Sequence, residues 1–457
     1  MRLAFAFLLA LPAAALAQQQ SKTYENGSVY RGEFAEGLPH GDGQLETRDG
    51  FLYRGTWVNG EMTGRGRAVF PSGAVYEGQF TRGEPDGEGK IIWADGGFYE
   101  GGFQMGVRTG TGRTVLNDGT VFEGGFRDGK YHGHGVLIRP GGGRIEGEFV
   151  DGVPGGHIIE ILPDGTRYEG GMQAGLRHGT GTLVRPDGSS YRGDWAEGRI
   201  TGDGILTGSD GAEYRGALVD GLRHGQGVMV WPNGDRYAGA YRADLEHGEG
   251  TLTRADGSAY AGTWSEGRMT GTGRLRGVGG DLYVGAVVDG VPEGEGTAYI
   301  PVERDADLTG PLRAREHQGV FSNGIPNGPG RRVSADGTVY EGGWSNGARE
   351  GEAVETLPDG SVYRGSFADN QRSGTGTLTR PDGTRYSGEW RDGLFHGQGD
   401  LRYPNGDHYV GGFRRGKRHG QGVLTTPEGE NYDGTWRDGL IDRPAPETPQ
   451  NNDAAEN

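Results

Sequence analysis

The feature that most constrains this chain is a sequence repeat of fixed length. A bulky residue followed two positions later by glycine recurs every 23 residues and then, after one longer interval of 34 residues, resumes the same period. Eighteen starts in one phase indicate a repeat array rather than ordinary globular domains. The starts are Tyr30, Tyr53, Tyr76, Tyr99, Phe122, Ile145, Tyr168, Tyr191, Tyr214, Tyr237, Tyr260, Tyr283, His317, Tyr340, Tyr363, Tyr386, Tyr409 and Tyr432.

Each repeat has the residue pattern of a β-hairpin. In the repeat that begins at Tyr386, residues Tyr386, Gly388 and Trp390 alternate, which places them on one face of a strand. Residues 397–401 alternate in the same way, and Gly393 lies between the two runs as a loop glycine would. One repeat therefore predicts two strands joined by a loop.

Successive hairpins are joined by dipeptides that favour tight turns. The sequence predicts that these dipeptides form primed two-residue turns, which connect antiparallel neighbours. A parallel crossover would need a dozen or more residues, and the repeat has no room for one. The dipeptides are Asp49-Gly50, Asp118-Gly119, Asp187-Gly188, Asn233-Gly234, Asp256-Gly257, Asp382-Gly383 and Asn405-Gly406.

The predicted fold is all-β: an elongated single-layer antiparallel β-meander or solenoid of about eighteen 23-residue hairpin repeats. One face should be aromatic and glycine-rich, and the other should carry Arg, Glu, Asp and Thr. Glycine stands two residues after every start, although glycine inside a strand normally weakens it. We expect rings such as Tyr386 and Trp390 to cover the glycine backbone of neighbouring strands. The alternative is that these glycines only mark bulges.

The segments outside the regular repeats define the expected organisation. We predict a signal peptide over 1–17, a first block of repeats over 18–298, an inserted loop over 299–316, a second block over 317–440 and a disordered tail over 441–457. The insert would be either a hinge or partner-binding loop or a neutral insertion. The tail is rich in proline and poor in apolar residues.

The N-terminal segment has the pattern of a secretory signal. Arg2 precedes an apolar run, and Ala15-Leu16-Ala17 has the small-x-small spacing of a cleavage site. A membrane anchor is the alternative, although the run is shorter than the roughly 20 residues that span a bilayer. We therefore expect a periplasmic or secreted protein. The absence of cysteine excludes a disulfide framework without contradicting that location.

Charge and residue chemistry argue against several function classes. A formal net charge of −17 makes nucleic acid a poor partner. No cofactor motif and no nucleophile beside a base can be identified, so we expect no enzyme activity and no cofactor. Seven histidines share one phase, but adjacent repeats would hold them too far apart to share a metal ion, so a loop-positioning role is expected instead. These are His40, His132, His178, His224, His247, His396 and His419.

The densest basic cluster is the one candidate contact site. Arg414, Arg415, Lys417 and Arg418 fall within a single hairpin loop and its flanks. They could contact phosphate or an acidic partner, and the alternative is a solvated loop.

The repeat resembles a known family. Tyr386-Ser-Gly-Glu-Trp390, then residues 396–399 (His-Gly-Gln-Gly), then Asn405-Gly406 is similar to the membrane occupation and recognition nexus (MORN) repeat over about residues 24–440. This resemblance, together with the signal-like start, identifies a bacterial MORN protein. It implies hairpin arrays that mediate protein association, often dimerisation, and that are linked to membranes. Some members carry a phosphoinositide kinase domain, which this chain lacks.

The expected function is a non-enzymatic repeat scaffold for protein–protein interaction in the cell envelope or outside the cell. Its partner would be a protein of unknown identity, with a homodimer and weak membrane association as further expectations. The alternative is envelope attachment through lipid head groups or glycan bound by the aromatic face. The acidic balance of the chain disfavours binding to anionic lipid.

Overall fold

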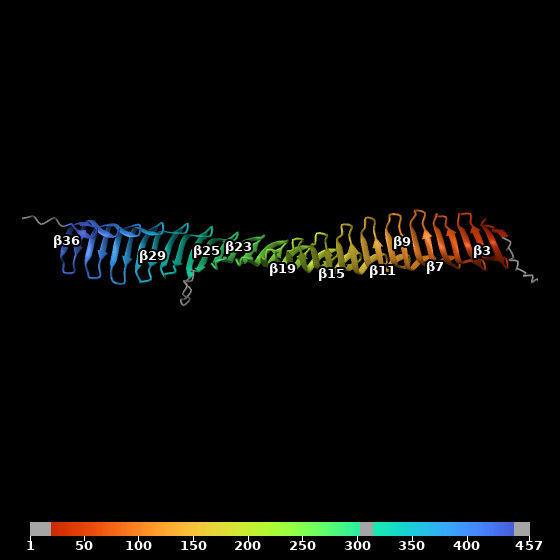
Figure 1. The fold of residues 1–457 in the computed structure, drawn as a ribbon, viewed down its shortest axis with the longest axis horizontal. Coiled ribbons are helices and arrows are strands. Elements are labelled where there is room, and N and C mark those ends of the chain that lie inside the picture. The colour runs from red at the N-terminus through yellow and green to blue at the C-terminus, as the bar shows by residue number, and fades with distance from the viewer. Residues whose placement is uncertain (1–19, 302–313, 443–457) are drawn as a thin grey trace, which may run out of the picture. The chain divides into compact units, whose positions relative to one another are not determined.

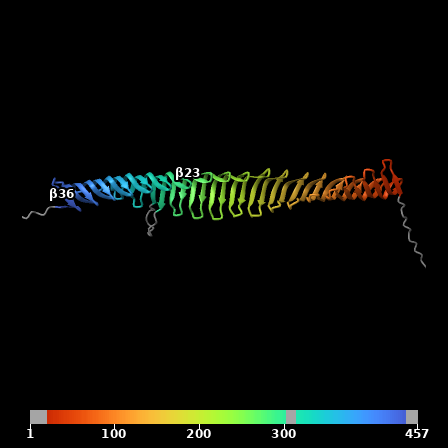
Figure 2. The ribbon, with the colours of Figure 1, turned by 90° about the horizontal axis from the view of Figure 1, so that it is seen from above.

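The computed structural model describes residues 20–301 and 314–442, and the regular structure of these residues is entirely β-strand. The predicted signal peptide over 1–17 lies outside the described residues, as do 302–313 and 443–457. The chain divides into two units, one ending at Leu222 and one beginning at Arg223, and each is described by itself. Figures 1 and 2 show the strands of each unit lying side by side in chain order.

The strands of the first unit are β1 (Gln20–Thr23), β2 (Val29–Ala35), β3 (Leu38–Glu46), β4 (Leu52–Val58), β5 (Glu61–Val69), β6 (Val75–Thr81), β7 (Glu84–Ile92), β8 (Phe98–Gln104), β9 (Val107–Val115), β10 (Val121–Arg127), β11 (Lys130–Ile138), β12 (Arg144–Val150), β13 (Val153–Ile161), β14 (Arg167–Gln173), β15 (Leu176–Val184), β16 (Ser190–Ala196), β17 (Arg199–Thr207) and β18 (Glu213–Val219). The strands that follow are β19 (Leu222–Val230), β20 (Arg236–Arg242), β21 (Leu245–Thr253), β22 (Ala259–Ser265), β23 (Arg268–Arg276), β24 (Leu282–Val288), β25 (Val291–Pro301), β26 (Ala314–Ser322), β27 (Ile325–Val333), β28 (Val339–Ser345), β29 (Ala348–Thr356), β30 (Val362–Ala368), β31 (Gln371–Thr379), β32 (Arg385–Arg391), β33 (Leu394–Arg402), β34 (His408–Arg414), β35 (Lys417–Thr425), β36 (Asn431–Arg437) and β37 (Leu440–Ile441).

Within each unit, every strand pairs antiparallel with the strands before and after it in the chain. In the hairpin β32–β33, Tyr386 lies opposite Leu401 and Gly388 lies opposite Gly399. The next pairing, β33–β34, places Gly399 opposite Gly411. The prediction of an all-β antiparallel meander of hairpin repeats is therefore confirmed for each unit.

The core of most repeats is one tyrosine ring lying over two glycines of its own hairpin. A Cβ atom added to Gly399 would lie 2.5 Å from the Tyr386 ring, and one added to Gly388 would lie 2.7 Å from its hydroxyl. Tyr386 is fully buried, and Trp390 packs edge-on against it with ring centroids 5.4 Å apart. The Trp390 ring also meets Tyr363 of the preceding repeat at 4.9 Å. The predicted cover of a neighbouring strand is confirmed for Gly399, whereas Gly388 lies under a ring of its own strand.

The alternative interpretation of the glycines, as bulge markers, is also correct in part. In β32–β33 the register shifts directly after Gly388, so that Glu389 lies opposite His396. The bulged strand bends at Gly397, whose φ of +52° is a conformation that favours glycine. The Tyr386 hydroxyl then donates a hydrogen bond to the Glu389 carbonyl at 2.7 Å. The ring over the glycines and the bulge therefore belong to one local structure, in which the bulge brings the Glu389 carbonyl to the Tyr386 hydroxyl.

The turn prediction was wrong about which connection is primed. The two-residue turn at Asp392 and Gly393 has φ of +51° and +77°, as a type I′ turn requires. At the Asn405-Gly406 connection, the Gly406 amide donates to the Tyr403 carbonyl at 3.0 Å, and only the glycine has a positive φ. That is a type I turn followed by a left-handed glycine. The physical reason is loop length. The Tyr403 amide donates to the Asp407 carbonyl at 2.8 Å, so the loop encloses three residues, and a three-residue hairpin loop takes a type I turn followed by a left-handed residue.

The insert lies between two paired strands. β25 and β26 extend to Pro301 and Ala314, which lie opposite each other, so the strand ladder continues up to residues 302–313. The loop predicted over 299–316 is therefore shorter at both ends, because residues 299–301 and 314–316 have pairing partners. The predicted tail also loses its first residue, since Ile441 belongs to β37 and pairs with Trp436.

Candidate functional site

The side chains opposite the aromatic rings form what we call the polar face. They alternate with the buried residues, so each start is followed by a residue that points to the other side. In the first unit these side chains form cross-strand ion pairs. Arg67 lies 3.0 Å from Glu77, and Lys90 lies 3.0 Å from Glu100. Each of the four side chains is at least 41% exposed, so these pairs contribute little to stability.

A groove about 1000 Å³ in volume crosses β2 to β8 on this face, and we call it the N-terminal groove. Its floor is the exposed backbone of the paired glycines, such as Gly66 and Gly78. Its walls carry charges of both signs, so it can bind a partner that presents both donors and acceptors. The charged residues that line it are Arg31, Asp42, Arg54, Arg65, Arg67, Glu77, Glu88, Lys90 and Glu100.

Two arginines in the N-terminal groove have no acidic partner among the described residues. Arg54 and Arg65 are exposed, and neither forms an ion pair with residues 20–301 or 314–442, whereas neighbouring Arg31 lies 3.6 Å from Glu46. Sequence reasoning missed this site. The available signal was the arginine or glutamate that follows most starts in the first unit, but such residues also suit a solvated strand face.

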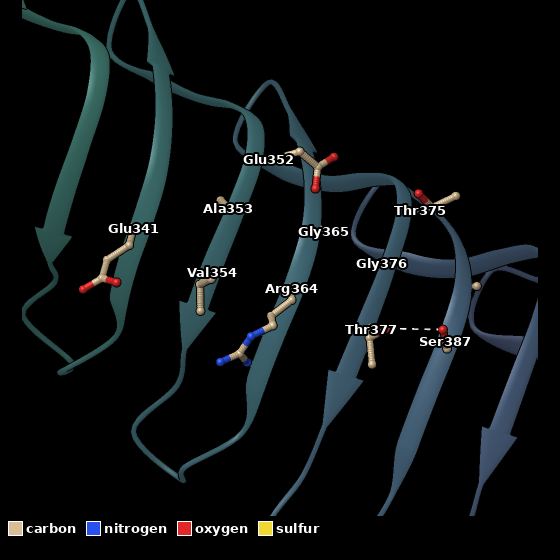
Figure 3. Close-up of a pocket in the computed structure, with 11 residues that line it drawn as sticks. Glu341, Glu352, Ala353, Val354, Arg364, Gly365, Thr375, Gly376, Thr377 and Ser387 are labelled. Carbon is tan, nitrogen blue, oxygen red and sulfur yellow. Dashed lines mark hydrogen bonds between the residues drawn. The ribbon is translucent and has the colours of Figure 1, made fainter.

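The polar face of the second unit is less charged. Figure 3 shows a hollow of about 740 Å³ where Glu341, Val354 and Arg364 project from neighbouring strands. Thr377 donates a hydrogen bond to Ser387 at 3.2 Å in the same hollow. Here the side chains are mostly short, so the surface offers fewer charged contacts than the N-terminal groove does.

The basic cluster predicted from the sequence does not form one surface. Arg414 ends β34, Arg415 is the first turn residue with φ of +50°, and Lys417 and Arg418 begin β35. Arg415 and Lys417 are exposed. They remain a candidate contact for an acidic partner.

Arg418 is instead part of the repeat packing. Its guanidinium lies 4.1 Å from the centre of the Trp436 ring and donates a hydrogen bond to the Gly439 carbonyl at 2.9 Å. Arg414 lies 3.8 Å from the Asp438 carboxylate. Both arginines therefore contact the following hairpin.

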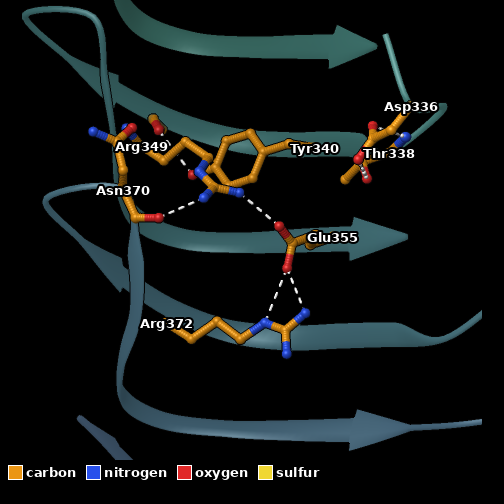
Figure 4. Close-up of polar contacts among 8 residues, drawn as sticks. Asp336, Thr338, Tyr340, Arg349, Glu355, Asn370 and Arg372 are labelled. Carbon is orange, nitrogen blue, oxygen red and sulfur yellow. Dashed lines mark hydrogen bonds and ion pairs between the residues drawn. The ribbon is translucent and has the colours of Figure 1, made fainter. Parts of the chain in front are cut away.

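In the second unit, a buried carboxylate joins two arginines that also stack on aromatic rings. Glu355 is 6% exposed, and its two oxygens accept hydrogen bonds from Arg349 and Arg372, each at 2.6 Å. Figure 4 shows Glu355 between the two guanidinium groups, with Asn370 beside Arg349. A buried charge of this kind needs its partners, and the three side chains act as a polar link across hairpins.

Two histidines of the row lie near turns of the next hairpin. His132 and His419 each lie near the turn aspartate of the next hairpin, at 3.8 Å from Asp151 and 3.9 Å from Asp438. In the described ranges, no three His, Asp or Glu side chains meet closely enough to hold one metal ion. Residues 20–301 and 314–442 also contain no helix long and apolar enough to cross a bilayer.

The aromatic rings that begin the repeats are buried. Tyr53 and Tyr76 are fully buried, and burial raises the pKa of each phenol to about 12. A sugar or a lipid head group would need to contact exposed ring faces, and these rings are covered by their own hairpins.

The sequence matches a family model described as MORN repeat in eighteen segments. The segments are 30–50, 53–75, 76–98, 99–121, 122–144, 146–167, 168–190, 191–213, 214–236, 237–259, 260–282, 283–301, 317–339, 340–362, 363–385, 386–408, 409–430 and 432–443. A search of curated protein sequences found no significant match.

Among solved structures, the chain is similar to the TCP10 domain of CPAP from Danio rerio, with 12% sequence identity, a TM-score of 0.16, and coverage of 61% of this chain and 99% of that one. It is also similar to the TCP domain of SAS-4 from Drosophila melanogaster, solved with a proline-rich motif of Ana2, with 13% identity, a TM-score of 0.15, and coverage of 52% and 99%. At these TM-scores the likeness carries no argument about the fold or the function of this chain.

Proposed function

Because the chain belongs to the MORN repeat family, we propose that it is a non-enzymatic scaffold that binds a protein partner through the N-terminal groove. Repeats of this family act in association with proteins and membranes. The observation that carries the proposal is the groove itself, where Arg54 and Arg65 stand without acidic partners beside the ion pairs Arg67–Glu77 and Lys90–Glu100.

The regular spacing of the strands supports an extended ligand. Neighbouring strands lie about 4.8 Å apart, so groove side chains recur at short, even intervals across seven consecutive strands. A partner segment with acidic residues opposite Arg54 and Arg65, and a basic residue opposite Glu88, would find complementary charges. The groove would then supply specificity, since its other charges repel a mismatched partner.

The setting and assembly are part of the same proposal. The protein acts in the periplasm or outside the cell, because residues 1–17 have the pattern of a secretory signal. It works without a cofactor and without enzyme activity, and it associates with itself or weakly with the membrane as the family resemblance implies. Attachment through the aromatic face has less support, because the rings are buried.

A site-specific photo-crosslinker tests the proposed groove. The crosslinking residue would replace Arg54 or Arg65, and in matched controls it would replace Arg274 or Arg364, which are also exposed on the polar face and form no ion pair within the described residues. Illumination in envelope extract should give a discrete protein adduct from positions 54 and 65 only. Equal adducts from all four positions, or none from the groove, would contradict the proposal.

A further inference from the structure

The repeat that begins at His317 departs from the others at two core positions. Histidine replaces the starting tyrosine, and Arg332 stands fifteen residues later, where nine repeats have leucine. The leucines at that position are Leu45, Leu137, Leu183, Leu206, Leu252, Leu275, Leu378, Leu401 and Leu424.

His317 is buried without hydrogen-bond partners. Its side chain is 3% exposed, and both ring nitrogens lack a partner. The ring lies edge-on to Trp344 and Phe321, with centroids 4.9 and 5.3 Å away. In the next repeat the tyrosine hydroxyl donates to the carbonyl three residues later, as Tyr340 does to Gly343 at 2.9 Å. Histidine makes no such bond, so a polar N–H group remains unpaired in the core.

Arg332 lies beside this histidine with no counterion. Its guanidinium stacks 3.9 Å from the centre of the Trp344 ring, and none of the described residues accepts a hydrogen bond from it. Burial, together with the charges of Arg349 and Arg315, lowers the pKa of Arg332. Arg315, Arg332 and Arg349 therefore place three positive charges close together on the aromatic face.

Two other repeats show how this chain normally compensates a charge at the same position. Glu160 lies 2.9 Å from Arg177, and Glu355 binds Arg372, so each charged residue meets an opposite charge seventeen residues later. For Arg332 the residue seventeen positions later is Arg349, which has the same sign. The paired arrangement has been replaced here by one that lacks negative charge.

An unpaired, half-buried cation and an unpaired, buried imidazole both destabilise a fold, and the repeat's own consensus would remove both. Sites that violate the pattern of the rest of a protein are often functional. We propose that His317, Arg332 and Arg315 form a binding site for an oxyanion, that is, for a phosphate or carboxylate group. The fork of the Arg332 guanidinium can donate two parallel hydrogen bonds to such a group. The His317 N–H, which is enclosed in the unbound chain, can donate a third when the group enters between the two side chains.

The remaining groups around the site fit this role. Trp344 holds the plane of the Arg332 guanidinium, which orients its donors. Arg349 already shares Glu355 with Arg372, so it adds positive potential without being the first contact. This oxyanion site lies on the aromatic face and goes beyond the proposed groove function, because neither its residues nor its ligand belongs to the N-terminal groove.

Consensus-restoring variants test the site without disrupting the fold. Binding of inorganic phosphate, and separately of acetate, would be measured by isothermal titration calorimetry at constant ionic strength for the wild type, Arg332→Leu and His317→Tyr. The matched control is Arg331→Leu, which removes the same charge one residue away, from the opposite face. Phosphate bound tightly and acetate weakly would assign a phosphate group, and the reverse would assign a carboxylate.

The expected result is saturable binding of one anion to the wild type, weakened about tenfold or more in Arg332→Leu and His317→Tyr and within about twofold of wild type in Arg331→Leu. Both consensus variants should melt at or above the wild-type temperature, which shows that lost binding is not lost folding. The proposal is overturned if neither anion binds the wild type, or if Arg331→Leu loses as much affinity as Arg332→Leu.

Discussion

The two faces of the sheet vary in different ways along the chain. The aromatic face keeps nearly the same side chains in every repeat, with buried rings such as Tyr53 and Tyr386 in both units. The polar face carries Arg54 and Glu77 in the first unit, whereas Ala238 and Ala261 occupy the equivalent positions in the second. Constancy on one face and variation on the other indicates that the aromatic face determines the fold, and it supports our proposal that the polar face selects the protein partner.

The largest expected effect is alkaline unfolding, which acts only through the aromatic face. The folded chain raises the pKa of Tyr53 and Tyr76 from 10.0 to about 12, because burial disfavours the phenolate. The contribution of the buried, neutral phenols to the free energy of unfolding is fully present below pH 10, and it is lost as pH rises from 10 to about 12. Phenolate absorbance and the β-sheet circular dichroism signal should therefore change together in that window. Tyrosines that ionise near pH 10 in an intact sheet would contradict the assignment.

A single added side chain under one ring should have the next largest effect. Gly399→Val would place its Cβ 2.5 Å from the Tyr386 ring and should destabilise the second unit by about 3 kcal/mol. Gln398→Val is the matched control, because Gln398 is exposed on the polar face of the same strand. Urea denaturation would compare the two variants. Equal midpoints would show that the faces are not distinct in their contribution to stability.

Two substitutions to the same consensus leucine should have opposite signs. Glu355→Leu leaves Arg349 and Arg372 without their buried carboxylate and should destabilise by about 2 kcal/mol, less than a fully enclosed pair would lose. Arg332→Leu removes a cation that has no counterion and should leave stability unchanged or raise it. Thermal melting checks both. If both variants melt lower by the same amount, charge pairing does not explain this core position.

The contrast between the two faces also explains which parts of the fold could be predicted from the sequence. Alternation of Tyr386, Gly388 and Trp390 sufficed for the strands and for the ring over glycine, because that packing is local and repeated. The turn assignment failed because Asn405-Gly406 suits a primed turn in a two-residue loop, whereas the strand pairing leaves a three-residue loop, which takes a type I turn followed by a left-handed glycine. The bulge after Gly388 depends on pairing register, which composition does not determine.

The candidate site was harder to predict, for a physical reason. Arg54 and Arg65 look like any solvated strand residues until their neighbours are found to be ion-paired and they are not. Arg414 and Arg418 were singled out because they are adjacent in sequence, yet both contact the following hairpin. Adjacency along a strand also places successive side chains on opposite faces, so a dense run of charge rarely makes one surface.

Charge reversal in the groove should have the smallest effect on stability and the most direct bearing on the account. Arg54→Glu/Arg65→Glu and the control Arg274→Glu/Arg364→Glu would be compared for melting temperature and for capture of the partner identified by crosslinking. Both doubles should melt within about 2 °C of wild type, since all four arginines are exposed. Capture should be lost in the groove variant alone. Retained capture by the groove variant, or loss of folding in it, would contradict the claim that the polar face binds the protein partner while the aromatic face holds the fold.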